Sequence, residues 1–348
     1  MKIDFLLIGG GIAGLSLGYR LKKAGKTIRI FDLPHENQSS RVAAGLFNPI
    51  TGRKMVKTWK ADQLFPEILP FYQELEQLTG KDFLNIQKIY RPFLSIEEQN
   101  EWMGHSADPG FTPYLDEIYN KSQSQSLYDS FGGVMLKNSG WLQIPKFLDA
   151  MSELLREELI FDQFVEEKLS KEDQQWRYDT LEFDGLIYCN GLGALNSTFF
   201  KFLPFAPVKG EILEVEQDFN PDYIVNRGVF RVGLEPNLHR VGSTYSKHDL
   251  DQGPTESAKM EILDRLKGLV NEPIISIKSH KTGIRPATRD RKPFLGKHPQ
   301  EKSVYIFNGF GAKGVSLVPY FSKLMTGYLL GDTSMEREVD IARYFNYI

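Results

Sequence analysis

The glycine cluster at residues 9–14 constrains the fold more than any other part of the sequence. It reads Gly-Gly-Gly-Ile-Ala-Gly and fits the spacing G-x-G-x-x-G. The apolar run at residues 3–8 predicts a buried strand before it, and apolar positions at helical spacing over residues 12–23 predict a helix after it. Glycines between a strand and a helix allow a tight turn and a close approach of pyrophosphate to the helix N-terminus. The segment therefore predicts a Rossmann-type nucleotide-binding unit.

An acidic residue ends the second predicted strand of this unit. That strand covers residues 27–31 and is followed by Asp32, whose carboxylate can accept hydrogen bonds from ribose hydroxyls and disfavours a 2′-phosphate. FAD and NAD sites share this fingerprint, so it leaves the choice of dinucleotide open. The pattern predicts dinucleotide contacts from Gly9, Gly11, Ile12, Ala13, Gly14, Asp32 and Leu33.

Composition and charge narrow the functional classes. The single cysteine, Cys189, excludes an internal disulfide, and the six histidines lack metal-binding spacing, so no metal site is expected. No run of about 18 apolar residues and no cleavage-type leader occurs, which predicts a cytoplasmic protein without a membrane span. A net charge of -3 argues against a nucleic-acid partner, although there is one basic run, which we interpret as a solvated face: Arg53, Lys54, Lys57 and Lys60.

Five further segments, in order along the chain, resemble the D-amino-acid oxidase and glycine oxidase family. Residues 283–288 read Gly-Ile-Arg-Pro-Ala-Thr and are similar to the start of the family's GxRPxT…D…P…G block. Residues 309–315 are similar to its GHGxxG loop, and three shorter matches lie at residues 42–46, 209–213 and 241–244. The resemblance covers nearly the whole chain and implies non-covalently bound FAD as the cofactor.

The same resemblance implies cofactor contacts beyond the glycine turn. Residues 42–46 match the family's small-residue stretch over the flavin, and residues 189–194 match its second strand-to-glycine turn near the pyrophosphate. We interpret Cys189 as a packed strand residue and not as a nucleophile or a flavin attachment point. The additional contacts implied are Ala43, Ala44, Gly45, Leu46, Val165, Cys189, Asn190, Gly191, Arg285, Gly309, Phe310, Gly311, Ala312, Lys313, Gly314 and Val315.

Two cations are candidates for catalytic roles. In the family that the chain resembles, the arginine at the position of Arg285 binds the substrate carboxylate, and a planar guanidinium suits that task. The alternative for Arg285 is a structural arginine between domains. Lys313 lies in the glycine loop before a predicted helix, where it and backbone N–H groups could stabilise negative charge on a reduced flavin. The alternative for Lys313 is a solvent-facing lysine.

The usual active-site tyrosine of the family is missing from this chain. Family members often carry it in a Y-x-x-P strand, whereas residues 230–233 read Phe-Arg-Val-Gly at the matching place. Tyr245, just after residues 241–244, is a candidate substitute for the substrate contact, and so is the stretch at residues 51–59. For each of these the alternative is an ordinary core or surface role.

The expected fold class is α/β, with a Rossmann-type FAD-binding domain and an inserted α+β substrate domain, as in glutathione-reductase-like and D-amino-acid-oxidase-like two-domain flavoproteins. Further helices are predicted at residues 61–78, 145–158, 256–269 and 315–330, and further strands at 180–188 and 304–307. Residues 83–136 predict short strands and loops. The FAD-binding domain is assigned residues 1–60, 140–204 and 275–348, and the substrate-binding domain residues 61–139 and 205–274.

The resemblance implies an FAD-dependent oxidoreductase that oxidises the C–N bond of a small amine or amino acid. The expected chemistry is hydride transfer from the α-carbon to flavin N5, followed by hydrolysis of the imine, with O₂ or an unknown electron acceptor. Such a reaction requires no general base from the protein. Three alternatives stay open: a tRNA wobble-uridine side-chain oxidase, a flavin-binding protein without amine oxidase turnover, and a nicotinamide dehydrogenase.

Overall fold

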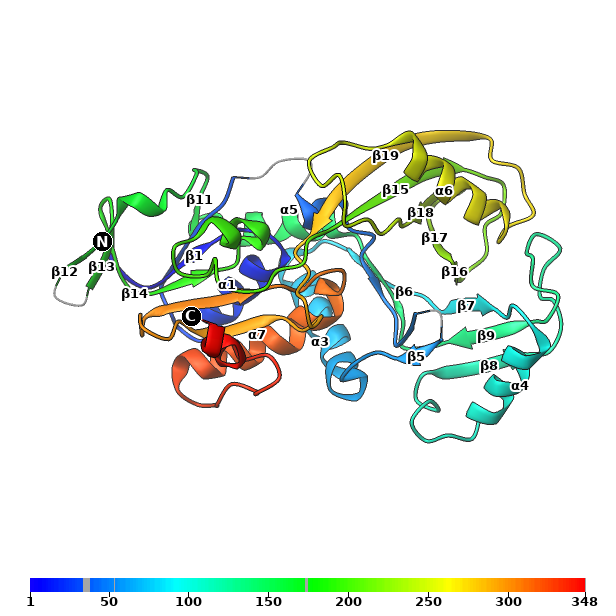
Figure 1. Cartoon of the computed structure of the whole chain (residues 1–348), viewed down its shortest axis with the longest axis horizontal. Helices are drawn as coiled ribbons and strands as arrows, with labels where there is room; N and C mark the ends of the chain where they lie inside the picture. The colour runs from blue at the N-terminus through cyan, green and yellow to red at the C-terminus, as the bar shows by residue number, and fades with distance from the viewer. Residues whose placement is uncertain (34–37, 53, 173–174, 348) are drawn as a thin grey trace.

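The computed structural model describes residues 1–33, 38–52, 54–172 and 175–347, which form two lobes side by side (Figure 1). The first lobe is built on a sheet whose central strands are parallel and run in the order β2-β1-β14-β21. Helices and loops cover both faces of this sheet, which explains why the buried positions of these strands are apolar. The strands predicted from the sequence are confirmed as β1 (Lys2–Ile8), β2 (Ile28–Phe31), β14 (Leu181–Tyr188) and β21 (Val304–Asn308).

Shorter strands extend this sheet on both sides. A two-residue strand pairs in parallel with β2, and two antiparallel strands continue from β14, while a third pairs with β21. They are β11 (Leu159–Ile160), β12 (Leu169–Glu172), β13 (Gln175–Tyr178) and β20 (Phe294–Lys297).

Four helices form a layer against the first sheet. α1 packs on α7 and α5, and α3 packs on α7, where the Tyr72 hydroxyl donates a hydrogen bond of 2.9 Å to the Val315 carbonyl. The sequence boundaries assign α3 to the substrate-binding domain, whereas in the structure it contacts α5 and α7. All four helices were predicted: α1 (Ile12–Lys23), α3 (Ala61–Thr79), α5 (Ile144–Leu154) and α7 (Gly314–Leu330).

The second lobe contains a mixed sheet in the order β19-β15-β18-β17-β16-β7-β9-β8. Its predicted helix, α6 (Glu256–Lys267), packs on one face of this sheet, where Ile262 and Leu266 meet Leu213 and Val241. Side chains of the opposite face, among them Ile89, Val134 and Val232, belong to the same buried apolar cluster as residues of α1 and α3 in the first lobe. The strands are β7 (Ile89–Pro92), β8 (Leu115–Tyr119), β9 (Gly133–Leu136), β15 (Val208–Glu216), β16 (Ile224–Arg227), β17 (Val229–Glu235), β18 (Leu238–Gly242) and β19 (Ser276–Arg285).

One helix of the second lobe, α4 (Ile96–His105), was not predicted. Only Gln99 and Trp102 of this helix are buried, so its apolar periodicity is too weak to read. Its start is nevertheless encoded locally, because the Ser95 hydroxyl accepts a hydrogen bond from the backbone N–H of Glu98. The aromatic-rich segment around it therefore contains a capped helix as well as the predicted strands.

The remaining elements are short and lie between the two lobes or at their edges. Strands β3, β10 and β6 form a small sheet, and β4 and β5 form a hairpin. Within the described residues, no helix is long and apolar enough to cross a membrane. The short elements are α2 (Ser39–Val42), β3 (Leu46–Phe47), β4 (Ile50–Thr51), β5 (Val56–Lys57), β6 (Leu84–Ile86), β10 (Gly140–Leu142), η1 (Glu166–Lys168), η2 (Gly191–Asn196) and η3 (Ile341–Tyr347).

Candidate active site

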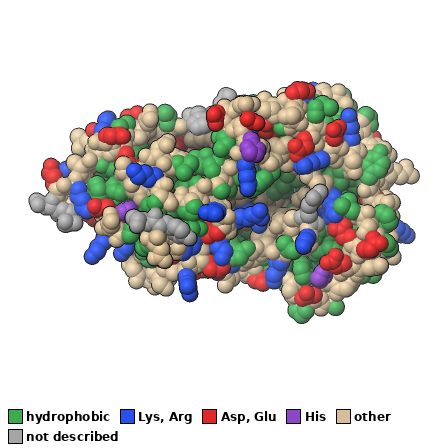
Figure 2. Space-filling model, viewed as in Figure 1, with side chains coloured by type: hydrophobic (Ala, Val, Ile, Leu, Met, Phe, Trp, Pro, Cys, Tyr) green, Lys and Arg blue, Asp and Glu red, His purple; other side chains and the backbone are tan. Residues whose placement is uncertain are grey.

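A cavity of about 710 Å³ lies between the two lobes. At one end it is lined by the carboxyl ends of β1 and β2, where Gly9 and Asp32 lie, and at the other by Phe230 and Arg285 of the second sheet. The carboxyl edge of a parallel sheet is where such folds bind their ligands. The face in Figure 2 is hollowed near its centre, and Lys and Arg side chains gather around this hollow.

The turn between β1 and α1 is packed so closely that only glycine fits. Gly9 has a φ of +103°, and a Cβ on it would lie 2.7 Å from the Cα of Asn190. A Cβ on Gly14 would lie 1.8 Å from the carbonyl oxygen of Gly9. The first turn of α1 is thereby held against the end of β14, with its N–H groups beside the cavity. This is the arrangement that binds a pyrophosphate.

Asp32 connects this turn to the end of β2. Its Oδ1 accepts a hydrogen bond of 2.8 Å from the backbone N–H of Gly10. Asp32 and Leu33, both predicted as dinucleotide contacts, line the cavity. The adjoining wall comes from Gln163 and Phe164, for which the sequence carries no recognisable motif.

Cys189 is buried at the end of β14 and lines the cavity with Asn190 and Gly191. Burial raises the pKa of its thiol, so the nucleophilic thiolate is suppressed. We expect Cys189 in the folded holoprotein to be unreactive toward Ellman's reagent and to be labelled completely in denaturant. Stoichiometric labelling of the native protein would contradict this description of Cys189 as a packed strand residue.

Arg285 ends β19 and lines the cavity beside Gly210 and Ser243. Its guanidinium donates to the Ser243 hydroxyl at 2.7 Å and to the carbonyl oxygens of Thr244 and Lys209 at 3.3 Å. Burial lowers the pKa of the Arg285 guanidinium. Among the described residues, no carboxylate pairs with Arg285. The cavity wall therefore carries a partly buried cation bonded to neutral acceptors alone.

The glycine loop before α7 forms the wall beside Arg285. Asn308 Nδ2 donates 2.9 Å to the Gly191 carbonyl oxygen, which ties this loop to the turn after β14. Gly311, in the left-handed region with a φ of +55°, lets the chain turn into α7. Burial and the neighbouring Arg291 lower the pKa of Lys313, which precedes the helix. The open N-terminus of α7 thus faces the same cavity as that of α1.

Most of the predicted contacts meet at this cavity. The side chains or backbones that line it are those of Gly9, Gly11, Ile12, Ala13, Asp32, Leu33, Ala43, Ala44, Gly45, Leu46, Cys189, Asn190, Gly191, Arg285, Phe310, Gly311, Ala312, Gly314 and Val315. Several other lining residues were not predicted. Gly283, Ile284 and Pro286 belong to the block at residues 283–288, and the others include Ser40, Ile212 and Phe164.

Five predicted residues do not line the cavity: Gly14, Val165, Gly309, Lys313 and Tyr245. Gly14 and Gly309 are tightly packed against other residues, where a Cβ would meet the Gly9 carbonyl oxygen and the Thr288 side chain, respectively. The Val165 N–H instead donates 3.1 Å to the Tyr178 hydroxyl. Tyr245 is 61% exposed, and its ring centroid lies 5.7 Å from the Arg285 guanidinium carbon.

Within the described part of residues 51–59, Met55 and Thr58 are buried and the other side chains lie at or near the surface, while Arg53 lies outside the described residues. Lys57 pairs with Asp62 at 2.8 Å, and Trp59 stacks on Phe321 with ring centroids 5.9 Å apart. Lys60, which follows, pairs with Glu336 at 2.9 Å. The Lys57 and Lys60 side chains are only 31% and 17% exposed, so within the described part of the basic run only Lys54 matches the interpretation as a solvated face.

Comparisons with known proteins bear on the identity of this site. The family model for FAD dependent oxidoreductases, DAO, matches residues 4–328. A glycine oxidase of Pseudomonas putida is 28% identical, with 95% of each chain covered. The tRNA 5-methylaminomethyl-2-thiouridine biosynthesis bifunctional protein MnmC of Legionella pneumophila is 22% identical over 95% of this chain, and the chain spans only 54% of that relative. A crystal structure of glycine oxidase from Geobacillus kaustophilus superposes with a TM-score of 0.79 at 20% identity, covering 99% of this chain and 98% of that one. The chain belongs to the DAO family of FAD-dependent oxidoreductases.

Proposed function

We propose that this FAD-dependent oxidoreductase oxidises the C–N bond of a small amino acid or carboxylated amine, and that Arg285 binds the substrate carboxylate. The observation that carries the proposal is the Arg285 guanidinium, which lies in the cavity wall with no carboxylate partner among the described residues. A partly buried cation is costly without an anion, and a carboxylate provides one in a bidentate geometry. The 28% identity to a glycine oxidase supports the same substrate class.

The residues around the cavity fit FAD. The glycine cradle at Gly9 and Gly14 leaves no room for a Cβ, and the N-terminus of α1 offers N–H groups to the pyrophosphate. Asp32 would hold the ribose, and the N-terminus of α7 favours negative charge at its end of the cavity. Bound there, FAD supplies the acceptor for the hydride of the substrate α-carbon.

The protein's own part in the reaction is to bind and orient the substrate. Arg285 fixes the carboxylate, and the apolar side chains of Ile212 and Phe230 restrict water beside it. The carboxylates among the described lining residues are Asp32 and Asp162, which belong to the end of the cavity formed by β2 and β11. No carboxylate or imidazole of the described residues lines the Arg285 end. This supports hydride transfer from a neutral amine without a protein base, after which water hydrolyses the imine.

The experiment that tests the proposal is a product assay. The holoprotein is incubated in air with glycine, sarcosine and a panel of D- and L-amino acids, and the carbonyl product is trapped and quantified with the released ammonia or amine. We expect one carboxylated amine to give equal amounts of both products, and its decarboxylated analogue to give neither. Equal turnover of the decarboxylated analogue would contradict the role of Arg285.

Asp32 gives a prediction about the cofactor itself. Asp32→Asn keeps an oxygen that can accept from the Gly10 N–H but removes the charge that strengthens bonds from the ribose hydroxyls. A hydrogen bond to a charged group contributes about 1.5–3 kcal/mol, so we expect FAD affinity to fall by roughly 10- to 100-fold. The measurement is fluorescence titration of apoprotein with FAD. Asp184→Asn on β14, an exposed carboxylate, is the control, and equal affinities in the two variants would contradict the assignment.

A further inference from the structure

A buried ion pair lies directly behind the wall that carries Arg285. Lys209 and Glu211 on β15 are each 2% exposed, with Lys209 Nζ 3.0 Å from Glu211 Oε1. They share one face of the strand because side chains alternate along it. Gly210, between them, presents the other face to the cavity, where a Cβ would lie 2.1 Å from Arg285 Nη2. The ion pair and the arginine are thus separated by a single strand.

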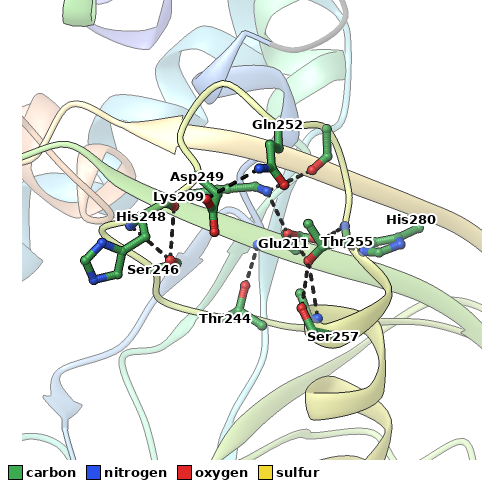
Figure 3. Close-up of polar contacts among 12 residues, drawn as sticks. Lys209, Glu211, Thr244, Ser246, His248, Asp249, Gln252, Thr255, Ser257 and His280 are labelled. Atoms are coloured by element: carbon green, nitrogen blue, oxygen red, sulfur yellow. Dashed lines mark hydrogen bonds and ion pairs between the residues drawn. The ribbon is translucent and has the colours of Figure 1, made fainter.

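Glu211 is the hub of the polar network in Figure 3. Besides Lys209, its carboxylate accepts from the Thr255 N–H at 2.8 Å and the Thr255 hydroxyl at 3.0 Å, and it lies 2.7 Å from His280 Nε2. Burial alone would raise the pKa of Glu211, but the hydrogen bonds from Thr255 and Lys209 outweigh it and hold the pKa below its usual value. The charged carboxylate is therefore the form that this site stabilises.

The network fastens both ends of one segment, residues 244–255, to β15. At the first end the Glu211 N–H donates 3.0 Å to the Thr244 hydroxyl, and Ser246 exchanges backbone hydrogen bonds of 2.8 and 3.0 Å with Lys209. At the second end Lys209 Nζ donates 2.8 Å to the Gly253 carbonyl oxygen, and Glu211 holds Thr255. Among the described residues, the hydrogen bonds that join this second end to β15 come from the side chains of the ion pair, beside the apolar packing of α6 on the strand.

The same segment supplies one of the acceptors that orient Arg285, the Thr244 carbonyl oxygen. Its guanidinium is bonded to the Thr244 carbonyl oxygen, to the Ser243 hydroxyl just before the segment, and to the Lys209 carbonyl oxygen. Because Thr244 and Lys209 both take part in the network, a shift of the segment relative to β15 would change the direction of the guanidinium. Tyr245, whose ring lies beside the guanidinium, would shift with it.

We propose that Glu211 is a positioning residue for carboxylate binding: it holds residues 244–255 on β15 and so fixes Arg285 in the orientation that receives the substrate. The inference rests on the proposed function of Arg285. A buried ion pair is a poor source of stability, since its desolvation offsets most of its attraction. Orienting the Arg285 guanidinium would account for the presence of the Lys209–Glu211 pair at this position.

The test is Glu211→Gln, which keeps the shape of the side chain and removes the charge. The matched control is Glu214→Gln on the same strand. Like Glu211, Glu214 pairs with a cation, Arg240 at 2.9 Å, and accepts a side-chain hydrogen bond, from Ser279 at 2.9 Å, but these partners lie outside residues 244–255. Acetate is the probe, since it carries a carboxylate and no C–N bond, and acetamide is its neutral counterpart. Binding to each FAD-loaded variant is followed by the flavin visible spectrum.

We expect Glu211→Gln to weaken acetate binding about tenfold or more with FAD content unchanged, and Glu214→Gln to bind acetate within about twofold of the unsubstituted protein. Acetate affinity unchanged in Glu211→Gln, with both variants merely less stable to heat, would overturn the positioning role and leave the proposed function intact. An unsubstituted protein that binds acetate no better than acetamide would overturn the proposed function and the inference with it.

A second pair of variants tests the positioning role of Glu211 if Glu211→Gln does not fold. Thr255→Val removes the hydroxyl that donates to Glu211, whereas Thr255→Ser retains it. We expect acetate binding to weaken in Thr255→Val and to be preserved in Thr255→Ser. Equal acetate affinities in these two variants would overturn the inference.

Discussion

Replacing Arg285 with methionine is expected to raise the KM for the carboxylated substrate, and the dissociation constant for acetate, by about 10²- to 10⁴-fold. Two charge-assisted hydrogen bonds of about 1.5–3 kcal/mol each account for that range. Arg285→Met also leaves the carbonyl oxygens of Thr244 and Lys209 without the donor they have now. FAD content should stay unchanged, and the measurements are steady-state kinetics and acetate titration.

Two controls accompany Arg285→Met. Arg285→Lys keeps the charge but loses the bidentate geometry. We expect its KM and its acetate dissociation constant to lie between those of the unsubstituted protein and those of Arg285→Met. Arg231→Met replaces another arginine with neutral partners: Arg231 is 1% exposed and donates to Gln217 at 2.9 Å, away from the lining of the cavity. It should lower thermal stability without changing acetate affinity. A KM in Arg285→Met equal to that of the unsubstituted protein would contradict the proposed role.

Gly14→Ala is expected to abolish most FAD binding. The added Cβ would lie 1.8 Å from the Gly9 carbonyl oxygen, and neither group can move without opening the turn that holds the pyrophosphate. Strain of about 1–3 kcal/mol corresponds to a roughly 5- to 150-fold loss of FAD affinity, and larger strain to a larger loss. FAD content after purification and fluorescence titration measure the effect.

The control for Gly14→Ala is Gly104→Ala in helix α4. A Cβ at Gly104 meets no heavy atom within 4 Å, so the substitution should stabilise the protein by roughly 0.5–1 kcal/mol with FAD content unchanged. A Gly14→Ala variant that retains full FAD content would contradict the close packing of this turn.

The parts of the fold that the sequence predicts are those governed by local pattern. The glycine turn at Gly9 and Gly14 and the helices α1 and α7 follow from the spacing of glycines and the periodicity of apolar residues. The family resemblance pointed to Arg285 as a site residue, and in the structure Arg285 lines the same cavity as Gly9. Helix α4 was not predicted because only two of its side chains are buried, too few to give a recognisable helical period of apolar residues.

The parts that escaped prediction depend on contacts between distant segments. The carboxylate of Glu211 meets Thr255 from 44 residues along the chain and His280 from 69, and no spacing rule brings these residues together. Tyr245 lies beside the Arg285 guanidinium yet is largely exposed, a combination that only the three-dimensional arrangement of residues 244–255 defines. Val165 was placed by analogy, and the hydrogen bond of its N–H to the Tyr178 hydroxyl could not be read from the sequence.

Oxidation of a carboxylated amine by the bound flavin can be observed in the visible spectrum of the purified protein before and after anaerobic addition of glycine, sarcosine and the D- and L-amino acids. We expect a yellow protein whose flavin absorbance is bleached by a carboxylated amine, with no bleaching at the same concentration in Arg285→Met. A yellow protein that no member of the panel bleaches would contradict the small-substrate proposal and direct attention to a larger substrate or a role without turnover. A protein that stays colourless even after reconstitution with FAD would contradict the account at its foundation.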